Sequence, residues 1–110
     1  MHELGLLRGV VDAVVAVTAE KPVSAVGVKV GSLSGAVPEA LEGAWPIAVA
    51  GTPLAGAKLE LELIPAAIWC PGCQAEQPID EFYALTCPVC GTPSGQLVRG
   101  REFAVAWAET

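Results

Sequence analysis

The sequence predicts an α+β protein: a small mixed sheet with two helices packed on one face, and a four-cysteine module inserted before the last strand. Three observations lead to this prediction. Apolar residues recur every three or four positions near the N-terminus, which is the period of a helix. They alternate with other residues in three later segments, which is the period of a strand. All four cysteines fall within residues 70–90, in a stretch that contains several turn-forming residues.

The first predicted element is an amphipathic helix from Leu4 to Ala19. Its apolar stripe repeats at steps of three and four and comprises Leu4, Leu7, Val11, Val14 and Thr18, widened by Val10 and Val15. Glu3 lies at or before the first turn, where the helix dipole favours a negative charge. Pro22 ends the helix because it drives Lys21 out of the α region. The helix therefore holds the N-terminus at one end of a packed element.

Three segments are predicted as strands because their side chains alternate. They are Val26–Val30, Lys58–Ile64 and Phe103–Trp107. Between the first two, residues 38–45 are predicted as a short helix that begins at Pro38, since proline is favoured in the first turn. Pro46 is expected to break or kink that helix.

The composition indicates one small folded protein and excludes several functions. Of the 110 residues, 53% are hydrophobic and 16% are charged, so a core is available and disorder is not expected. The net charge is −6 and basic residues do not cluster, which argues against binding to nucleic acid. The sequence offers no nucleophile paired with a base, so an enzyme is not expected.

The first twenty residues resemble a signal peptide only loosely. The apolar stretch has no basic start and is interrupted by Asp12. No segment reaches the roughly 18 uninterrupted apolar residues that a membrane-spanning helix needs. We therefore expect a cytoplasmic protein that does not interact with membranes.

The four cysteines form two Cys-x-x-Cys pairs, Cys70 with Cys73 and Cys87 with Cys90. Two such turns facing each other can complete a tetrahedron of thiolates around zinc. Four thiolates leave no open position, so the site would be structural, as in a zinc ribbon. The alternatives are iron in the same site, two disulfides in an oxidising compartment, and a redox dithiol. Zinc is favoured because two matched pairs suit it and nothing indicates export.

The chain is divided accordingly into two units. Residues 66–95 form the zinc-binding module, and residues 1–65 and 96–110 form the α+β domain. The last predicted strand follows the module along the chain. The module therefore interrupts the sheet-forming part of the sequence instead of following it.

The only histidine is the second residue, His2. Imidazole is the commonest side-chain metal ligand near neutral pH. Two further nitrogens are within reach of a metal there, the terminal amine of Met1 and the backbone amide of His2 itself. A planar, nitrogen-rich set suits nickel(II) or copper(II) better than it suits zinc, which prefers tetrahedral sites. The alternative is a solvated terminal residue with no role as a ligand.

Met1-His2-Glu3-Leu4 ahead of an amphipathic helix, combined with two late Cys-x-x-Cys pairs, resembles the HypA family of hydrogenase maturation factors, which deliver nickel. The resemblance covers nearly the whole chain. Gly31-Ser32-Leu33-Ser34 before the short helix resembles the middle segment of the family. Leu59-Glu60-Leu61 leading to Trp69-Cys70 resembles the family's entry into the zinc module.

The resemblance implies one site for each of two metals. His2 would be the essential nickel ligand, with the Met1 amine and the His2 amide beside it and Glu3 close enough to complete or tune the site. A structural zinc would be held by Cys70, Cys73, Cys87 and Cys90. Some relatives carry further histidines in or beside the module, and this chain has none there. A second imidazole for nickel would therefore have to come from another molecule.

The resemblance also implies two partners: a nickel-handling maturation GTPase of the HypB type and the large subunit of NiFe hydrogenase. In some members the delivery also serves urease. The leading hypothesis is a nickel metallochaperone that binds Ni(II) at its N-terminus and delivers it to the hydrogenase, which makes residues 1–65 and 96–110 the nickel-binding domain. The alternative is a zinc-ribbon scaffold that mediates protein contacts without a nickel role.

Overall fold

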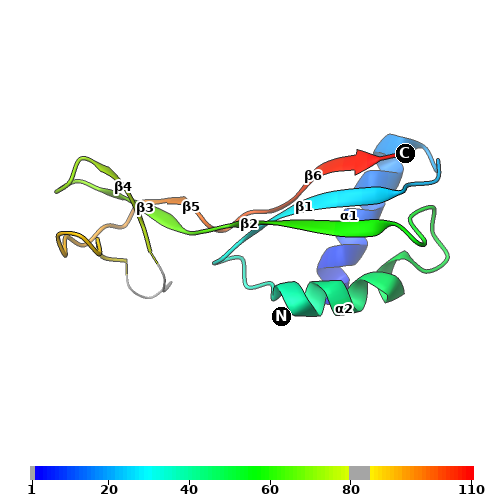
Figure 1. Cartoon of the computed structure of the whole chain (residues 1–110), viewed down its shortest axis with the longest axis horizontal. Coiled ribbons are helices and arrows are strands. Elements are labelled where there is room, and N and C mark those ends of the chain that lie inside the picture. The colour runs from blue at the N-terminus through cyan, green and yellow to red at the C-terminus, as the bar shows by residue number, and fades with distance from the viewer. Residues whose placement is uncertain (1, 80–84) are drawn as a thin grey trace.

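The structure, a computed structural model, describes residues 2–79 and 85–110. The molecule is elongated, 51 × 22 × 16 Å, with a three-stranded sheet towards each end (Figure 1). Along the chain the elements are α1 (Glu3–Thr18), β1 (Ala25–Gly31), α2 (Pro38–Val49), β2 (Lys58–Ile64), β3 (Ala67–Cys70), β4 (Ala75–Pro78), β5 (Leu97–Arg99) and β6 (Phe103–Glu109). Two helices and two small sheets confirm the predicted α+β class. Neither α1 nor α2 could span a lipid bilayer.

Helix α1 forms where the apolar stripe predicts it. The stripe is buried at Leu7, Val10, Val11 and Val14. The helix begins with His2 as its N-cap residue. It ends because Ala19 adopts a left-handed conformation, with φ of 53°, and its amide donates to the Val15 carbonyl oxygen at 3.0 Å. The chain therefore leaves the helix before Pro22, which was expected to end it.

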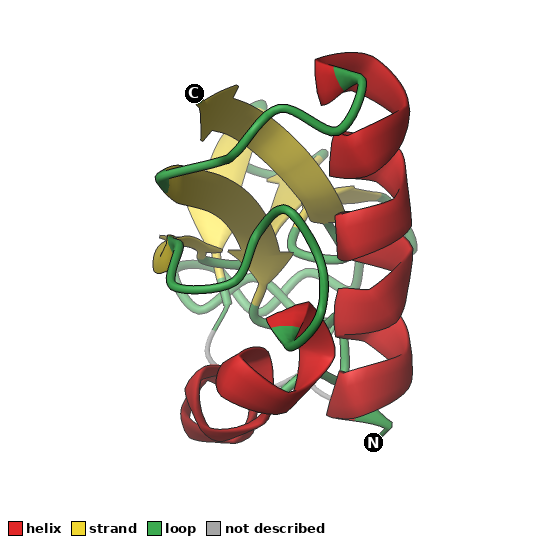
Figure 2. Ribbon diagram, turned by 90° about the vertical axis from the view of Figure 1, so that its right-hand side faces the viewer, coloured by secondary structure: helices red, strands yellow, loops and turns green. Residues whose placement is uncertain are grey.

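The first sheet has the order β2-β1-β6, with β1 parallel to β2 and antiparallel to β6. Both helices lie on the same side of this sheet (Figure 2). The side chains of Val26, Val28 and Val30 on the central strand are consequently buried beneath the helices. The predicted mixed sheet with two helices on one face is confirmed.

Within the described residues, no helix covers the other face of this sheet. A bulge between Gly27 and Val28 shifts the register of β6, so that Trp107 pairs with Gly27. The Trp107 indole lies against the Gly27 backbone, where the Cβ of any larger residue would overlap it. Trp107 is 42% exposed there, although its alternation with Val105 predicted a common face for the two residues.

Helix α2 continues through Pro46, so the predicted break at this residue is wrong. A proline inside a helix removes one backbone hydrogen bond and crowds the preceding turn. Packing offsets this cost, because Trp45 and Val49 are buried in the core that α2 shares with α1. The indole N–H of Trp45 also donates to the Ala57 carbonyl oxygen at 2.8 Å. The helix is thus held from its buried side, and the exposed proline does not end it.

The cysteine module contains the second sheet, in the order β4-β3-β5, with antiparallel pairing throughout. The sequence did not predict these strands, because segments of three or four residues are too short to show a period. They enclose a separate core of Ala66, Ile68, Cys70, Ile79 and Cys87, against which Leu33 packs. Strand β5 lies after residue 95 in the sequence, yet it pairs with β3 of the module. The module boundaries at residues 66 and 95 therefore remain a proposal.

A neck, which we define as residues 31–33, 65–66 and 100–102, joins the two sheets. The Ala66 amide donates to the Ser32 hydroxyl oxygen at 3.0 Å, and the Leu33 amide donates to the Gly100 carbonyl oxygen at 2.6 Å. Gly100 has a φ of 128°, and a Cβ placed on it would lie only 2.7 Å from the Cβ of Ala66. The neck therefore depends on close backbone contacts that leave no room for a side chain at this position.

Candidate metal centres

The cysteines of the module lie in two turns. Strand β3 ends at Cys70, and the following turn brings the Cys73 amide to the Cys70 sulfur at a distance of 3.3 Å. In the second turn the Val89 amide donates to the Cys87 sulfur at 3.4 Å. In both pairs the first sulfur thus accepts a backbone hydrogen bond from the turn that follows it.

The four sulfur atoms form one cluster, in which all lie within 4.8 Å of one another. The Cys70 and Cys90 sulfurs are 3.4 Å apart, and the Cys73 and Cys87 sulfurs are 3.8 Å apart. A tetrahedral zinc with Zn–S bonds of about 2.3 Å requires sulfurs about 3.8 Å apart. A disulfide would require about 2.05 Å, and all four cysteines are free. The donor set and its spacing therefore fit a structural zinc.

Thr92 is a further member of this centre that sequence reasoning missed. Its hydroxyl oxygen lies 3.1 Å from the Cys90 sulfur. A hydrogen bond from this hydroxyl, together with the Thr92 amide, lowers the pKa of Cys90 to about 6. The thiols of Cys90 and Cys87 raise the pKa of Cys73 to about 12. The available signal was a hydroxyl residue two positions after the last cysteine, which is too common a pattern to be diagnostic.

Of the predicted nickel ligands, His2 and Glu3 lie at the start of α1. His2 is exposed, and its carbonyl oxygen accepts the first helical hydrogen bond, from the Leu6 amide at 3.1 Å. The first amides of a helix have no acceptor within the helix, so the His2 amide is not engaged by the helix ladder. Met1, whose amine is a predicted donor, lies outside the described residues.

Glu3 links the start of α1 to the start of α2. Its carboxylate oxygen Oε2 accepts a hydrogen bond from the Val37 amide at 3.2 Å. This bond lowers the pKa of the Glu3 carboxyl below its ordinary value. Val37 is the N-cap residue of α2 and supplies no side-chain cap of its own, so Glu3 satisfies an amide at that helix end. The pairing joins residues 34 positions apart, which a local pattern does not reveal.

The structure keeps the two candidate centres apart. The start of α1 lies beside the start of α2, near the middle of the long axis, whereas the cysteine module forms one end of the molecule (Figure 1). Among the described residues, the four cysteines form the only cluster of potential metal ligands. One segment, residues 31–38, contacts both regions, because Leu33 packs on the module core and Val37 binds Glu3.

The fold and the four-cysteine centre define the class of this protein: a small α+β protein with an inserted cysteine module whose four sulfurs could hold a metal ion. More particularly, the chain belongs to the HypA family. The family model, described as hydrogenase/urease nickel incorporation metallochaperone, matches residues 1–110. The protein is therefore a member of a metallochaperone family that acts in nickel incorporation.

Individual relatives agree with the family assignment. The hydrogenase maturation factor HypA of Chloroflexus aggregans is 39% identical over 113 residues, which cover 100% of this chain and 99% of that protein. The protein of the same name from Deinococcus radiodurans is 38% identical over 94% of this chain and 88% of its own. The solution structure of the nickel metallochaperone HypA from Helicobacter pylori shares the fold, with a TM-score of 0.65 at 14% identity over 100% of this chain and 97% of that one.

Proposed function

We propose that the protein binds Ni(II) at its N-terminus and delivers it to NiFe hydrogenase during maturation. The nickel ligands are the Met1 amine and the amide and imidazole nitrogens of His2, with Glu3 adjacent. The observation that carries this proposal is the position of the only histidine at residue 2, exposed at the start of a packed helix. Membership of a nickel incorporation family supports it.

A chelate of three nitrogens suits a protein that transfers nickel better than it suits a protein that stores nickel. It leaves a coordination position for Glu3, for water or for a ligand from the recipient, so nickel can leave by stepwise ligand replacement. The amine and the amide must lose protons to bind, and loading therefore weakens as pH falls. Glu3 also has a positioning role. Its carboxylate accepts a hydrogen bond from the Val37 amide, which holds the first turn of α1 against the start of α2 and so positions His2.

We further propose that Cys70, Cys73, Cys87 and Cys90 hold a structural zinc that shapes residues 66–95, while residues 1–65 and 96–110 form the nickel-binding domain. Four thiolates leave zinc no open position, so no catalysis is assigned to it.

The proposed partners are a nickel-handling GTPase of the HypB type, which supplies or times the transfer, and the large subunit of the hydrogenase. The family's role in nickel incorporation supports this setting, and we place the protein in the cytoplasm.

Calorimetric titration of nickel into the untagged, zinc-loaded protein tests the terminal chelate. Two variants are compared with the native chain, His2→Ala and a chain with one glycine added before Met1. We expect each to lose at least about tenfold in affinity, since even outer partners of metal ligands contribute that much. Circular dichroism of both variants checks that their helix content, including α1, is unchanged.

Unchanged nickel affinity in both variants would reject the terminal chelate. A scaffold without a nickel role predicts a different result: His2→Ala would then retain full hydrogenase maturation in cells. The same variant, assayed in both ways, therefore separates the two functions.

A further inference from the structure

Strand β2 has a free edge. It is the outermost strand of its sheet, next to β1 alone. The Lys58 amide donates to the Ser24 carbonyl oxygen, and the Ser32 amide donates to the Ile64 carbonyl oxygen, both at 2.9 Å. In a parallel pair, alternate residues of a strand bond to the same neighbour. The even-numbered residues of β2 therefore face β1, and the odd-numbered residues direct their N–H and C=O groups away from the sheet.

These outward groups belong to Leu59, Leu61 and Leu63. In the part of the chain that the structure describes, no hydrogen bond from outside the sheet reaches their backbone. A regular seven-residue strand with three such residues is a template for another strand. Strand β6, at the opposite edge, is interrupted by a bulge and is a poorer template. The edge of β2 is therefore the place in the first sheet where a strand could be added.

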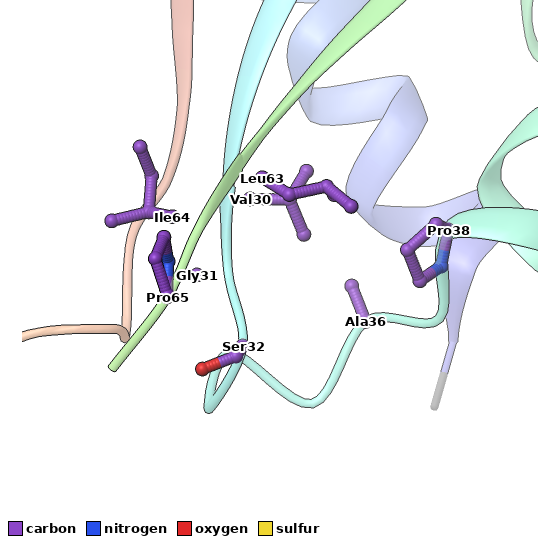
Figure 3. A pocket seen from close by; sticks show the side chains of 8 residues that line it. All are labelled: Val30, Gly31, Ser32, Ala36, Pro38, Leu63, Ile64 and Pro65. Carbon is purple, nitrogen blue, oxygen red and sulfur yellow. The ribbon is translucent and has the colours of Figure 1, made fainter. Parts of the chain in front are cut away.

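The two faces of β2 differ in chemistry. Glu60 and Glu62 are exposed on the face away from the helices, and the whole chain carries a net charge of −6. On the helix side, Leu63 is 59% exposed and lines a pocket of about 510 Å³. Figure 3 shows Leu63 and Val30 pointing towards Pro38 across this pocket, with Ala36 below. An added strand would thus meet carboxylates on one face and an apolar pocket on the other.

A second copy of β2 would bring like charges together at this edge. A symmetric dimer would pair two β2 strands antiparallel. In the register that overlaps all of Lys58–Ile64, Glu60 lies opposite Glu62 of the other copy. A shift by two residues along the strand places Glu62 opposite Glu62 in one direction and Glu60 opposite Glu60 in the other, where Lys58 also lies opposite Glu62. Like charges directly opposite each other destabilise a strand pair. The same carboxylates that oppose self-pairing favour a basic strand.

We propose that the free edge of β2 binds an extended basic segment of a protein partner as a fourth strand of the first sheet. Leu59, Leu61 and Leu63 supply the main-chain hydrogen bonds, as in other cases of strand addition. Lysine or arginine at alternate positions of the segment faces Glu60 and Glu62. The apolar residues between them face the helix side, where one enters the pocket beside Leu63. This docking surface does not depend on nickel binding at His2.

The probe is a blocked peptide of alternating lysine and valine, seven residues long, added to the isotopically labelled full-length protein at low salt. Hydrogen exchange is followed at each amide of β2. In the free protein we expect the even-numbered amides to be protected and those of Leu59, Leu61 and Leu63 to exchange rapidly. The peptide should slow these three amides at least about tenfold while the even-numbered amides change little.

Two N-methylated peptides test whether the main chain mediates binding in the native protein. An antiparallel strand directs its valine amides to β2, so methylation of the valines abolishes binding and methylation of the lysines does not. A parallel strand gives the reverse result. Binding that survives both modifications would reject strand addition.

Protein variants test the two remaining contributions. Leu63→Pro removes an outward N–H while keeping the bonds to β1, and Leu63→Ala is its matched control with the N–H retained. We expect the proline variant to bind the peptide more weakly than the alanine variant. The double change Glu60→Lys and Glu62→Lys should weaken the lysine peptide about tenfold and admit the matching glutamate peptide.

Equal affinity of the charge-reversed protein for both peptides would overturn the proposal. Rapid exchange at the odd-numbered amides despite excess peptide would do the same. A third contrary result is protection of these amides in the free protein that disappears on dilution, which would identify a second copy of the chain as the occupant.

Discussion

The hydroxyl group of Thr92 has a large effect on the pKa of one cysteine in the cysteine centre. It lies 3.1 Å from the Cys90 sulfur and is the largest cause of the lowered pKa of Cys90, about 6. Cys90 is also exposed, whereas Cys70 and Cys87 are buried. In the metal-free protein at neutral pH, Cys90 is therefore the thiolate that a reagent reaches first.

This leads to a prediction for the metal-stripped protein at pH 7. Iodoacetamide should label Cys90 before the other three cysteines, as read by peptide mass spectrometry. Thr92→Val removes the hydroxyl, raises the pKa of Cys90 towards its ordinary value and should slow this labelling several-fold. Thr92→Ser keeps the hydroxyl and should label at the native rate. Equal rates in all three proteins would show that the hydroxyl does not stabilise the thiolate.

At the scale of elements, the bond between Glu3 and Val37 couples the starts of the two helices. A carboxylate with a lowered pKa in the folded state contributes stability above its unfolded pKa, and this contribution is lost as pH falls through the folded value. The coupling is consequently complete at neutral pH and weakens only in acid, below the ordinary pKa of glutamate.

We predict that Glu3→Gln speeds hydrogen exchange at the Val37 amide and at the first turn of α1, while global unfolding by urea changes little. Glu39→Gln is the matched control, since Glu39 is also an acidic residue in the first turn of a helix. In the native protein, the chemical shift of the Val37 amide should titrate in acid with the lowered pKa. The coupling would be contradicted if the chemical shift of the Val37 amide did not change with pH and its hydrogen exchange did not change in Glu3→Gln.

At the scale of the whole molecule, the separation of the two cores has consequences for metal removal. Zinc binding in such modules is largely folding free energy, of order 10 kcal/mol in zinc-finger peptides. The core around Leu7 and Val28 contains none of the cysteines, and the core around Ile68 contains two of them. Loss of zinc should therefore unfold one end of the molecule and spare the other.

Chelation of zinc from the loaded protein, followed by NMR, checks this expectation. Signals of Ile68 and Leu33 should shift or broaden, and those of Leu7 and Val28 should keep their native positions. The Val37 amide should respond weakly, since residues 31–38 link the module core to Glu3. Simultaneous loss of both sheets would show that the two cores form one cooperative unit.

Much of the fold could be predicted from the sequence because its signals are local. The stripe from Leu4 to Thr18 predicted a helix over Leu4–Ala19, within one residue of its true limits, and the alternation in Lys58–Ile64 predicted β2 without error. The predicted break at Pro46 was wrong because tertiary packing of Trp45 outweighed a local preference. The strands of the module were missed because they are too short to carry a period.

The sequence by itself determined the class of fold, the four sulfur donors and a histidine next to the N-terminus, because residue type, spacing and periodicity are properties of neighbouring positions. Only the tertiary structure decided that Glu3 binds Val37, that Thr92 contacts Cys90, that the neck joins two separate cores, and that β2 lies at a free edge. Most of these features depend on which distant segments meet in space. That outcome follows from the packing of the whole chain.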